Sequence, residues 1–213
     1  MPVLNEAQGI RAALEALAPL RGRGHEVIVA DGGSNDGTPD LARPLCDRLV
    51  VAPRGRALQM NAGARVAEGD VLLFLHADTV LPPHASEAIS QSTADHVWGR
   101  FDVAIEGRHP MLKVIAWSMN LRSRLSGIAT GDQAIFVRRD AFPGFEEIAL
   151  MEDIAFSKAM KRRGRPACLR QRVRTSGRRW ESRGVLRTVA LMWRLRLAYA
   201  LGVDPARLAE KYR

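Results

Sequence analysis

The stretch that most constrains the fold is Val71–Asp78, with the sequence VLLFLHAD. Its five consecutive apolar residues indicate a strand that is buried on both faces, as the strands of parallel sheets are. Ligands of open α/β sheets bind outside the carboxyl ends of the strands, so His76 and Asp78 should face a binding crevice. The alternative is that Asp78 only caps a helix whose start is indicated by Pro82 and Pro83.

The size and composition describe one globular domain. The chain has 213 residues, of which 46% are hydrophobic and 26% charged, which excludes a disordered or fibrous class. The net charge of +9 comes mainly from arginine, and we predict no nucleic-acid partner from it. The two cysteines, Cys46 and Cys168, suggest neither a disulfide framework nor a zinc site, so a cytoplasmic location is expected. No apolar run is long enough for a membrane-spanning helix.

Strands and helices alternate through the first half of the sequence. Strands are predicted at His25–Asp31 and Leu49–Ala52, and helices at Ile10–Leu20 and Arg56–Ala67. Such alternation implies right-handed crossovers, and therefore an α/β fold with a mostly parallel central sheet flanked by helices. Residues 1–6 look like the loop that follows a first strand, so we expect the residues of that strand to lie further upstream.

The second half is predicted to mix strands and helices less regularly. Strands are expected at Val97–Ile105, Ala134–Arg138 and Pro166–Val173. Helices are expected at Met111–Leu125, Glu152–Arg163 and Gly184–Leu201. The last of these is rich in apolar residues and carries Arg187 and Arg194 on one face.

Three polar groups follow the strand that ends at Asp31. Asp31, Ser34 and Asp36 place two carboxylates and a hydroxyl at one strand terminus, where they can accept hydrogen bonds from a ribose or a base. The alternative is a solvated turn that Asp and Asn side chains cap. Neither the G-x-G-x-x-G fingerprint nor the Walker lysine is present.

Two pairs of groups suit metal binding and proton transfer. His76 and Asp78 can hold a hard divalent cation that also binds phosphate oxygens. Glu152 and Asp153 begin a predicted helix, where carboxylates are stabilised but also serve as ordinary caps.

A basic segment with one aromatic residue follows the last predicted strand. The guanidinium groups of Arg178 and Arg179 can clamp phosphates, and the indole of Trp180 can stack on a sugar. The alternative for each arginine is an ordinary charged surface.

Five segments carry a resemblance to a known family. They are PVLNE at 2–6, ADGGSNDGT at 30–38, RGRALQMNAGARVAEGDVLLFLHADT at 54–79, GDQAIFVRR at 131–139 and MEDIAF at 151–156. In this order they resemble the family 2 glycosyltransferases of the GT-A fold, which are inverting enzymes, and a short bacterial subgroup among them. The resemblance covers nearly the whole chain. It departs from the family pattern where His76 replaces the first acid of the D-x-D metal motif, and where the first strand is truncated.

The resemblance implies a nucleoside diphosphate sugar as donor and a divalent cation, Mg²⁺ or Mn²⁺, as cofactor. The expected donor-binding residues are Pro2, Asn5, Glu6, Asp31, Ser34, Asp36, Gln59, Asn61, Ala77, Arg178 and Arg179. Asp132, Gln133 and Trp180 are expected on the acceptor side. Asp78, with His76 beside it, is expected to hold the metal. Asp153 is expected to be the catalytic base, with Glu152 as the other candidate.

We therefore expect one glycosyltransferase domain over residues 1–213, with a nucleotide-sugar-binding half at 1–105 and an acceptor-side half at 106–213. It would transfer a hexose to a hydroxyl acceptor with inversion, and a lipid-linked acceptor is left open. One alternative is a nucleotidyltransferase, which would need a lysine or arginine on a triphosphate near the first loop. The other is a noncatalytic protein bound to the inner face of the membrane, suggested by the basic C-terminal half and its amphipathic helix.

Overall fold

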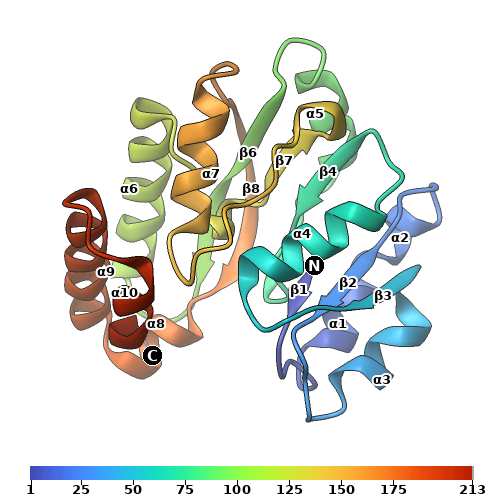
Figure 1. Ribbon diagram of the computed structural model, residues 1–213, viewed down its shortest axis with the longest axis horizontal. Coiled ribbons are helices and arrows are strands. Elements are labelled where there is room, and N and C mark those ends of the chain that lie inside the picture. Colours follow the sequence, from blue (N-terminus) through green and yellow to red (C-terminus); the bar gives the residue numbers. More distant parts are fainter. Residues whose placement is uncertain (213) are drawn as a thin grey trace.

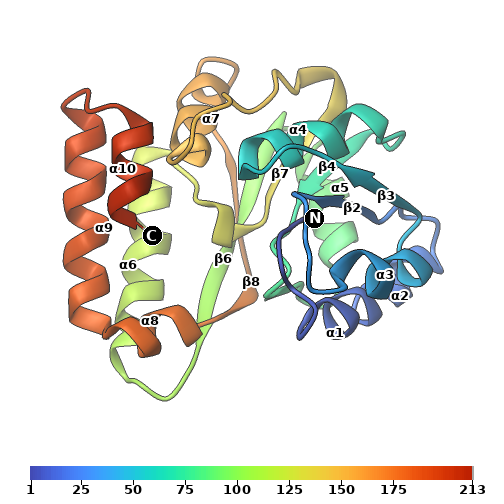
Figure 2. The ribbon, with the colours of Figure 1, turned by 60° about the horizontal axis from the view of Figure 1, so that its bottom comes forward.

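The computed structural model describes residues 1–212, apart from the side chain of Arg179. Two sheets occupy its centre and helices surround them (Figure 1). The N-terminal segments, in blue, lie on one side of the molecule, and the C-terminal helices, in red, lie on the other (Figures 1 and 2).

The N-terminal part of the chain forms a small parallel sheet. Its strands are β1 (Pro2–Val3), β2 (Ile28–Asp31) and β3 (Arg48–Val51), in the order β1-β2-β3. Val3 lies opposite Asp31, so β1 and β2 end at the same edge of the sheet. This register brings together the two loops that carry most of the predicted donor-binding residues.

A second sheet has five strands in the order β4-β7-β6-β8-β5. Their bounds are Val71–Phe74 for β4, Thr79–Val80 for β5, Trp98–Glu106 for β6, Ile135–Arg138 for β7 and Ala167–Ser176 for β8. β6 and β8 are parallel, and the other three pairs are antiparallel. The predicted α/β class is confirmed, with parallel pairing throughout the first sheet and mixed pairing in the second.

The strand at the start of the VLLFLHAD stretch differs from its prediction in one respect. β4 pairs with β7 in the antiparallel direction, and this contradicts the parallel arrangement expected from its apolar run. An apolar run reports burial of both faces, with Leu72 and Phe74 buried on one face and Val71 and Leu73 partly buried on the other, but it carries no information on the direction of the neighbouring strand. β4 ends at Phe74, so His76 and Asp78 lie in the loop beyond its carboxyl end, as expected.

The helices lie close to their predicted positions. Their bounds are Ile10–Glu15 for α1, Ala18–Arg21 for α2, Thr38–Ala42 for α3, Arg56–Val66 for α4, Ala85–Ser92 for α5, Met111–Ser126 for α6, Glu152–Lys161 for α7, Arg178–Arg183 for α8, Val185–Ala200 for α9 and Pro205–Tyr212 for α10. The predicted first helix is divided into α1 and α2, because Pro19 begins a new helical turn. The short elements β1, β5, α8 and α10 were not predicted. Residues 1–6 were predicted to be a loop, whereas Pro2 and Val3 form β1 because they pair with β2.

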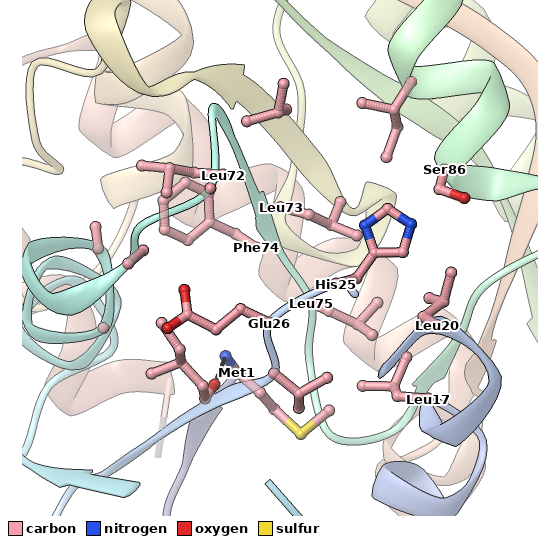
Figure 3. Close-up of a pocket in the computed structure, with 18 of the residues that line it drawn as sticks. Met1, Leu17, Leu20, His25, Glu26, Leu72, Leu73, Phe74, Leu75 and Ser86 are labelled. Atoms are coloured by element: carbon pink, nitrogen blue, oxygen red, sulfur yellow. Dashed lines mark hydrogen bonds between the residues drawn. The ribbon is translucent and has the colours of Figure 1, made fainter. Parts of the chain in front are cut away.

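A cavity of about 860 Å³ lies between β2 and β4 (Figure 3). Met1, Ile28 and Leu72 are among the residues that line it, whereas His76, Asp78 and Asp153 are not. The amino group of Met1 donates to the carbonyl of Ile28 at 2.8 Å, and burial lowers the pKa of this amino group to about 5. This cavity is therefore separate from His76, Asp78 and Asp153, which were predicted to carry the chemistry.

Candidate functional site

Asp31 holds the loop after β2 together by accepting hydrogen bonds from it. The backbone N–H groups of Gly33 and Ser34 both donate to Oδ2 of Asp31 at 2.9 Å, and the Ser34 hydroxyl donates to Oδ1. Asp31 is 2% exposed. This is the capped turn that the sequence left open as an alternative. Contact between Asp31 and a nucleoside stays a prediction.

The loop after β1 is bonded to the loop after β2. The N–H of Asn5 donates to Oγ of Ser34, and the N–H of Glu6 donates to Oγ1 of Thr38, both at 2.8 Å. The hydroxyl of Thr38 in turn donates to Asp36. That hydroxyl first, and backbone N–H groups after it, hold the pKa of Asp36 below its usual range. The predicted donor residues of both loops thus form one hydrogen-bonded unit.

Glu6 connects this unit to the predicted metal residues. The pKa of its partly buried carboxyl group is raised, first by burial and then by the negative charge of Asp78. Arg178 and His76 are also close enough to act on it, in the opposite direction. The structure therefore brings residues from four distant parts of the sequence into one region.

Asp78 fits a divalent cation better than His76 does. The carboxylate of Asp78 is exposed, and the hydroxyls of Thr79 and Thr175 approach it at 3.3 and 3.5 Å. Nδ1 of His76 lies 3.4 Å from Oδ1 of Asp132, and its buried Nε2 has no partner among the described residues. No group of three or more His, Cys, Asp or Glu residues suited to a metal occurs in residues 1–212. An exposed carboxylate suits Mg²⁺ or Mn²⁺ when phosphate oxygens complete the coordination.

Asp153, the second residue of α7, is largely enclosed by protein. The N–H of Gly131 donates to its Oδ2 at 3.0 Å, and the N–H of Ile154 donates to its Oδ1 at 2.8 Å. Burial, and after it the charge of Glu152, raises the pKa of Asp153 to about 6. Such a carboxylate is still ionised at neutral pH and is a stronger base than an ordinary aspartate.

Glu152 is buried and paired. It is 3% exposed, and its Oε1 lies 3.2 Å from Nη1 of Arg56. Because this ion pair occupies the Glu152 carboxylate, Asp153 is the member of the acidic pair that remains suited to proton transfer.

A small pocket joins the metal motif to the acidic pair. It has a volume of about 10 Å³, and Arg56, His76, Gly131, Glu152 and Asp153 line it with four others. A Cβ atom at Gly131 would lie 2.6 Å from the ring of His76, so the ring can pack there only against glycine. Gly131 thus contacts His76 on one side and donates to Asp153 on the other.

Three amide residues predicted to contact substrates have hydrogen-bond partners within the protein. Gln133 is 0% exposed, and its Oε1 accepts from the N–H of Thr130, while its contact with an acceptor stays a prediction. Gln59 is buried and donates to one carbonyl of β1 and one of β2. Asn61 exchanges two hydrogen bonds with the backbone of Phe145. In each case the side-chain amide forms at least one hydrogen bond with the backbone, because buried polar groups need hydrogen-bond partners.

The remaining predicted residues lie on several different elements. Arg178 is exposed at the start of α8, and the side chain of Arg179 lies outside the described part of the chain. Trp180 packs partly buried against the hydrophobic core, as does Ala77. Pro2 belongs to β1, and Asp132 lies in a short 3₁₀ turn beside His76. Their contacts with donor or acceptor stay predictions.

Sequence reasoning missed two arginines of the site. Arg56 neutralises Glu152, and it lies inside one of the segments that carried the family resemblance, where it received no role. Arg122 of α6 lies close enough to Asp153 for their charges to interact. Its Nε and Nη2 atoms are buried without a partner in the described structure. No local pattern marks Arg122, because its position depends on how α6 packs.

Comparison with known proteins identifies the family. Residues 1–149 match the model for glycosyl transferase family 2, and the chain therefore belongs to this family. A PGL/p-HBAD biosynthesis glycosyltransferase of Mycobacterium bovis is 36% identical over 88 residues, which are 38% of this chain and 34% of that protein. The succinoglycan biosynthesis protein ExoA of Rhizobium meliloti is 36% identical over 98 residues, 42% of this chain and 30% of that protein. The matches span about a third of the length of these relatives.

Solved structures agree with the fold. The mannosyltransferase PcManGT of Pyrobaculum calidifontis, solved with GDP-Man and Mn²⁺, has a TM-score of 0.65 at 20% identity over 99% of this chain and 67% of that chain. S. aureus TarS 1-349 in complex with UDP-GlcNAc has a TM-score of 0.63 at 20% identity over 82% of this chain and 56% of that chain. The fold is therefore that of the GT-A glycosyltransferases.

Proposed function

We propose that the protein is an inverting glycosyltransferase that transfers a sugar from a nucleoside diphosphate sugar to a hydroxyl acceptor. The observation that carries this proposal is the enclosed Asp153, with a pKa raised to about 6, in the same pocket as His76 of the metal motif. A base of this strength next to a diphosphate site suits direct displacement at an anomeric carbon.

Asp153 removes the proton of the acceptor hydroxyl as the hydroxyl oxygen attacks the anomeric carbon from the face opposite the diphosphate. The N–H of Gly131 holds the Asp153 carboxylate in place through Oδ2. Arg56 neutralises Glu152, and this keeps a second negative charge from raising the pKa of the base further. The residues 1–105 and 106–213 then act as the donor half and the acceptor half.

The donor side consists of the bonded loops after β1 and β2, with Asp31 and Asp36 assigned to the nucleoside. Asp78 would hold the divalent cation, and Arg178 would stand near the diphosphate. A bound Mg²⁺ or Mn²⁺ supplies charge neutralisation for the leaving diphosphate. Support comes from the complexes of the structural neighbours, which contain Mn²⁺ with GDP-Man in one case and UDP-GlcNAc in another.

A labelled nucleoside diphosphate sugar tests the reaction type. We expect release of the nucleoside diphosphate, and the release should depend on Asp153. Release of pyrophosphate from a nucleoside triphosphate would instead show the nucleotidyltransferase that the sequence left as an alternative. That alternative needs a lysine or arginine on a triphosphate near the first loop, and Arg178 is close enough to act on Glu6 there, so this assay decides between the two.

Thermal shift with UDP, GDP and TDP sugars, each with and without Mn²⁺, identifies the donor. A ligand at 100 times its dissociation constant adds about 2.7 kcal/mol to the free energy of unfolding, so the preferred donor gives the largest shift. The cytoplasmic location stays a prediction from the two cysteines, which are both free thiols in the structure.

A further inference from the structure

The exposed apolar residues of the protein are concentrated on two helices. Among the described residues, ten large hydrophobic side chains are exposed, and eight of them belong to α6 or to α9 and its last turn. They are Val114, Trp117, Leu121 and Leu125 on α6, and Leu186, Trp193, Leu197 and Leu201 on α9. Figures 1 and 2 both show α6 and α9 next to each other on the same outer side of the molecule. We call these eight residues the apolar wall.

The apolar wall lies opposite the packed faces of its helices. On α6 the wall residues follow one another at intervals of three and four residues, on the side away from the buried Leu112 and Ile115. On α9 they lie away from the buried Val185 and Leu195. Both Trp117 and Trp193 are exposed by more than 60%, at 65% and 72%. Each helix is therefore apolar both toward the core and toward the outside, which a purely solvated helix is not.

The two helices that carry the apolar wall bear charges of one sign only. The sequences of α6 and α9 contain no aspartate or glutamate and six basic residues. Lys113, Arg187 and Arg194 are exposed, whereas Arg124 is paired with Asp102. A surface that combines exposed Trp and Leu with Lys and Arg, without acids, is complementary to the interface of an anionic bilayer.

We propose that the apolar wall docks on the surface of an anionic lipid bilayer, with α6 and α9 lying against the membrane. None of the helices among residues 1–212 is both long and apolar enough to cross a bilayer, so the contact is peripheral. A second copy of the chain fits less well, because two acid-free basic faces would repel each other across a symmetric interface. The C-terminal helix that the sequence singled out is thus half of a larger surface.

The apolar wall lies one helix away from the proposed base. α9 packs on α7 through Leu195 and Ile154, and Nζ of Lys158 lies 5.1 Å from the ring centroid of Tyr199. α7 begins with the acidic pair. Docking would therefore hold the acceptor side of the pocket near the membrane, which favours a lipid-linked hydroxyl acceptor. This last step rests on the proposed function, whereas the docking itself does not.

Flotation of the full chain with lipid vesicles tests the docking. The vesicles contain phosphatidylcholine alone, or phosphatidylcholine and phosphatidylglycerol in equal amounts. We expect the protein to float with the anionic vesicles at low salt, to float less as salt is added, and to stay unbound with phosphatidylcholine. The double variant Arg187→Gln with Arg194→Gln should bind about 30-fold more weakly, and Trp117→Ser with Trp193→Ser should lose binding further.

Two exposed valines outside the apolar wall provide a matched control. Val51→Ser with Val80→Ser removes the same number of exposed apolar side chains, and we expect unchanged flotation. Thermal denaturation checks that all variants are folded. Absence of binding to anionic vesicles at low salt, or binding that neither double variant weakens, would overturn the proposal. So would a concentration-dependent dimer in sedimentation that Trp117→Ser dissociates, because a second copy would then cover the wall.

The two readouts separate docking from the proposed function. Donor binding is measured by thermal shift with a soluble nucleoside diphosphate sugar and Mn²⁺ in the absence of vesicles, and it requires neither an acceptor nor lipid. A protein that floats but binds no nucleoside diphosphate sugar keeps the docking and refutes the proposed function. A protein that binds the donor without floating does the reverse.

Discussion

The loops after β1 and β2, which we propose bind the donor (the donor loops), and the pocket around Asp153 shift the pKa values of their carboxylates in opposite directions. In the donor loops, Asp36 accepts hydrogen bonds that hold its pKa below the usual range. In the pocket, Asp153 is enclosed beside Glu152, and its pKa rises to about 6. The first arrangement stabilises the ionised form and the folded loop together. The second keeps a charge that the fold itself disfavours, which is typical of a reactive group rather than a structural one.

The same comparison separates the two members of the acidic pair. Glu152 is satisfied by Arg56, as Asp36 is satisfied by its own loop. Asp153 accepts hydrogen bonds from two backbone N–H groups and forms no ion pair with a cation of the described residues. We therefore propose a structural role for Glu152 and a chemical role for Asp153.

The largest effect is expected for Asp153→Asn on turnover. The variant should lose roughly 10² to 10⁴ in kcat, the usual contribution of a general base, with the donor dissociation constant nearly unchanged. Steady-state kinetics and donor titration measure the two quantities separately. Glu152→Gln is the matched comparison and should be milder. If Glu152→Gln is the crippling change, the two roles are exchanged.

The second prediction is that the same variant, although it loses activity, gains stability. At pH 7, Asp153→Asn should raise the free energy of unfolding by about 2 to 3 kcal/mol, because it removes a disfavoured charge. The pKa in the folded state, about 6, lies above the ordinary 3.8, so the protonated form stabilises the fold at low pH and this contribution is lost as the pH rises through 6. The gain should therefore vanish near pH 4 in chemical denaturation. Asp36→Asn should instead lower the free energy of unfolding. If both variants change this free energy in the same direction, the contrast between Asp153 and Asp36 is wrong.

The third prediction concerns the cation. Asp78→Ala should weaken Mn²⁺-dependent donor binding by roughly 10- to 100-fold while the melting temperature without ligand changes little, because the side chain is exposed at a strand end. Calorimetric titration of donor with and without Mn²⁺ measures this. Asp95→Ala, which removes an exposed acid elsewhere, is the control. Unchanged affinity in Mn²⁺ would remove Asp78 from the metal site.

The fourth prediction is the pH dependence of turnover. Because the base must be ionised and its pKa is about 6, kcat should fall about tenfold between pH 7 and pH 5. An ordinary aspartate would leave kcat nearly flat over this range. A flat profile would therefore show that the catalytic base is not the enclosed carboxylate of Asp153.

The sequence was sufficient for the donor loops but not for the pocket. The strand, the glycine-rich loop and the acids of residues 25–38 are contiguous, so local pattern predicts that they meet. Gln133 shows the opposite case, because nothing local reveals that its amide would be buried by Thr130 and α6. Arg122 was missed for the same reason. The direction of β4 was also unpredictable, since an apolar run has the same appearance next to a parallel or an antiparallel neighbour.

The smallest effect is expected at His76, which lies between the two regions. His76→Asp should restore a second acid next to Asp78 and tighten Mn²⁺ binding by less than the Asp78→Ala variant weakens it. The nearby Asp132, 3.4 Å from the imidazole, will oppose a new carboxylate unless a cation lies between them. Titration of Mn²⁺ against His76→Asp and against the uncharged His76→Asn distinguishes the cases. Tightening in the Asp variant alone would place position 76 in the coordination sphere. No tightening in either would assign His76 to holding Asp132 and packing on Gly131, as its two ring nitrogens do in the structure.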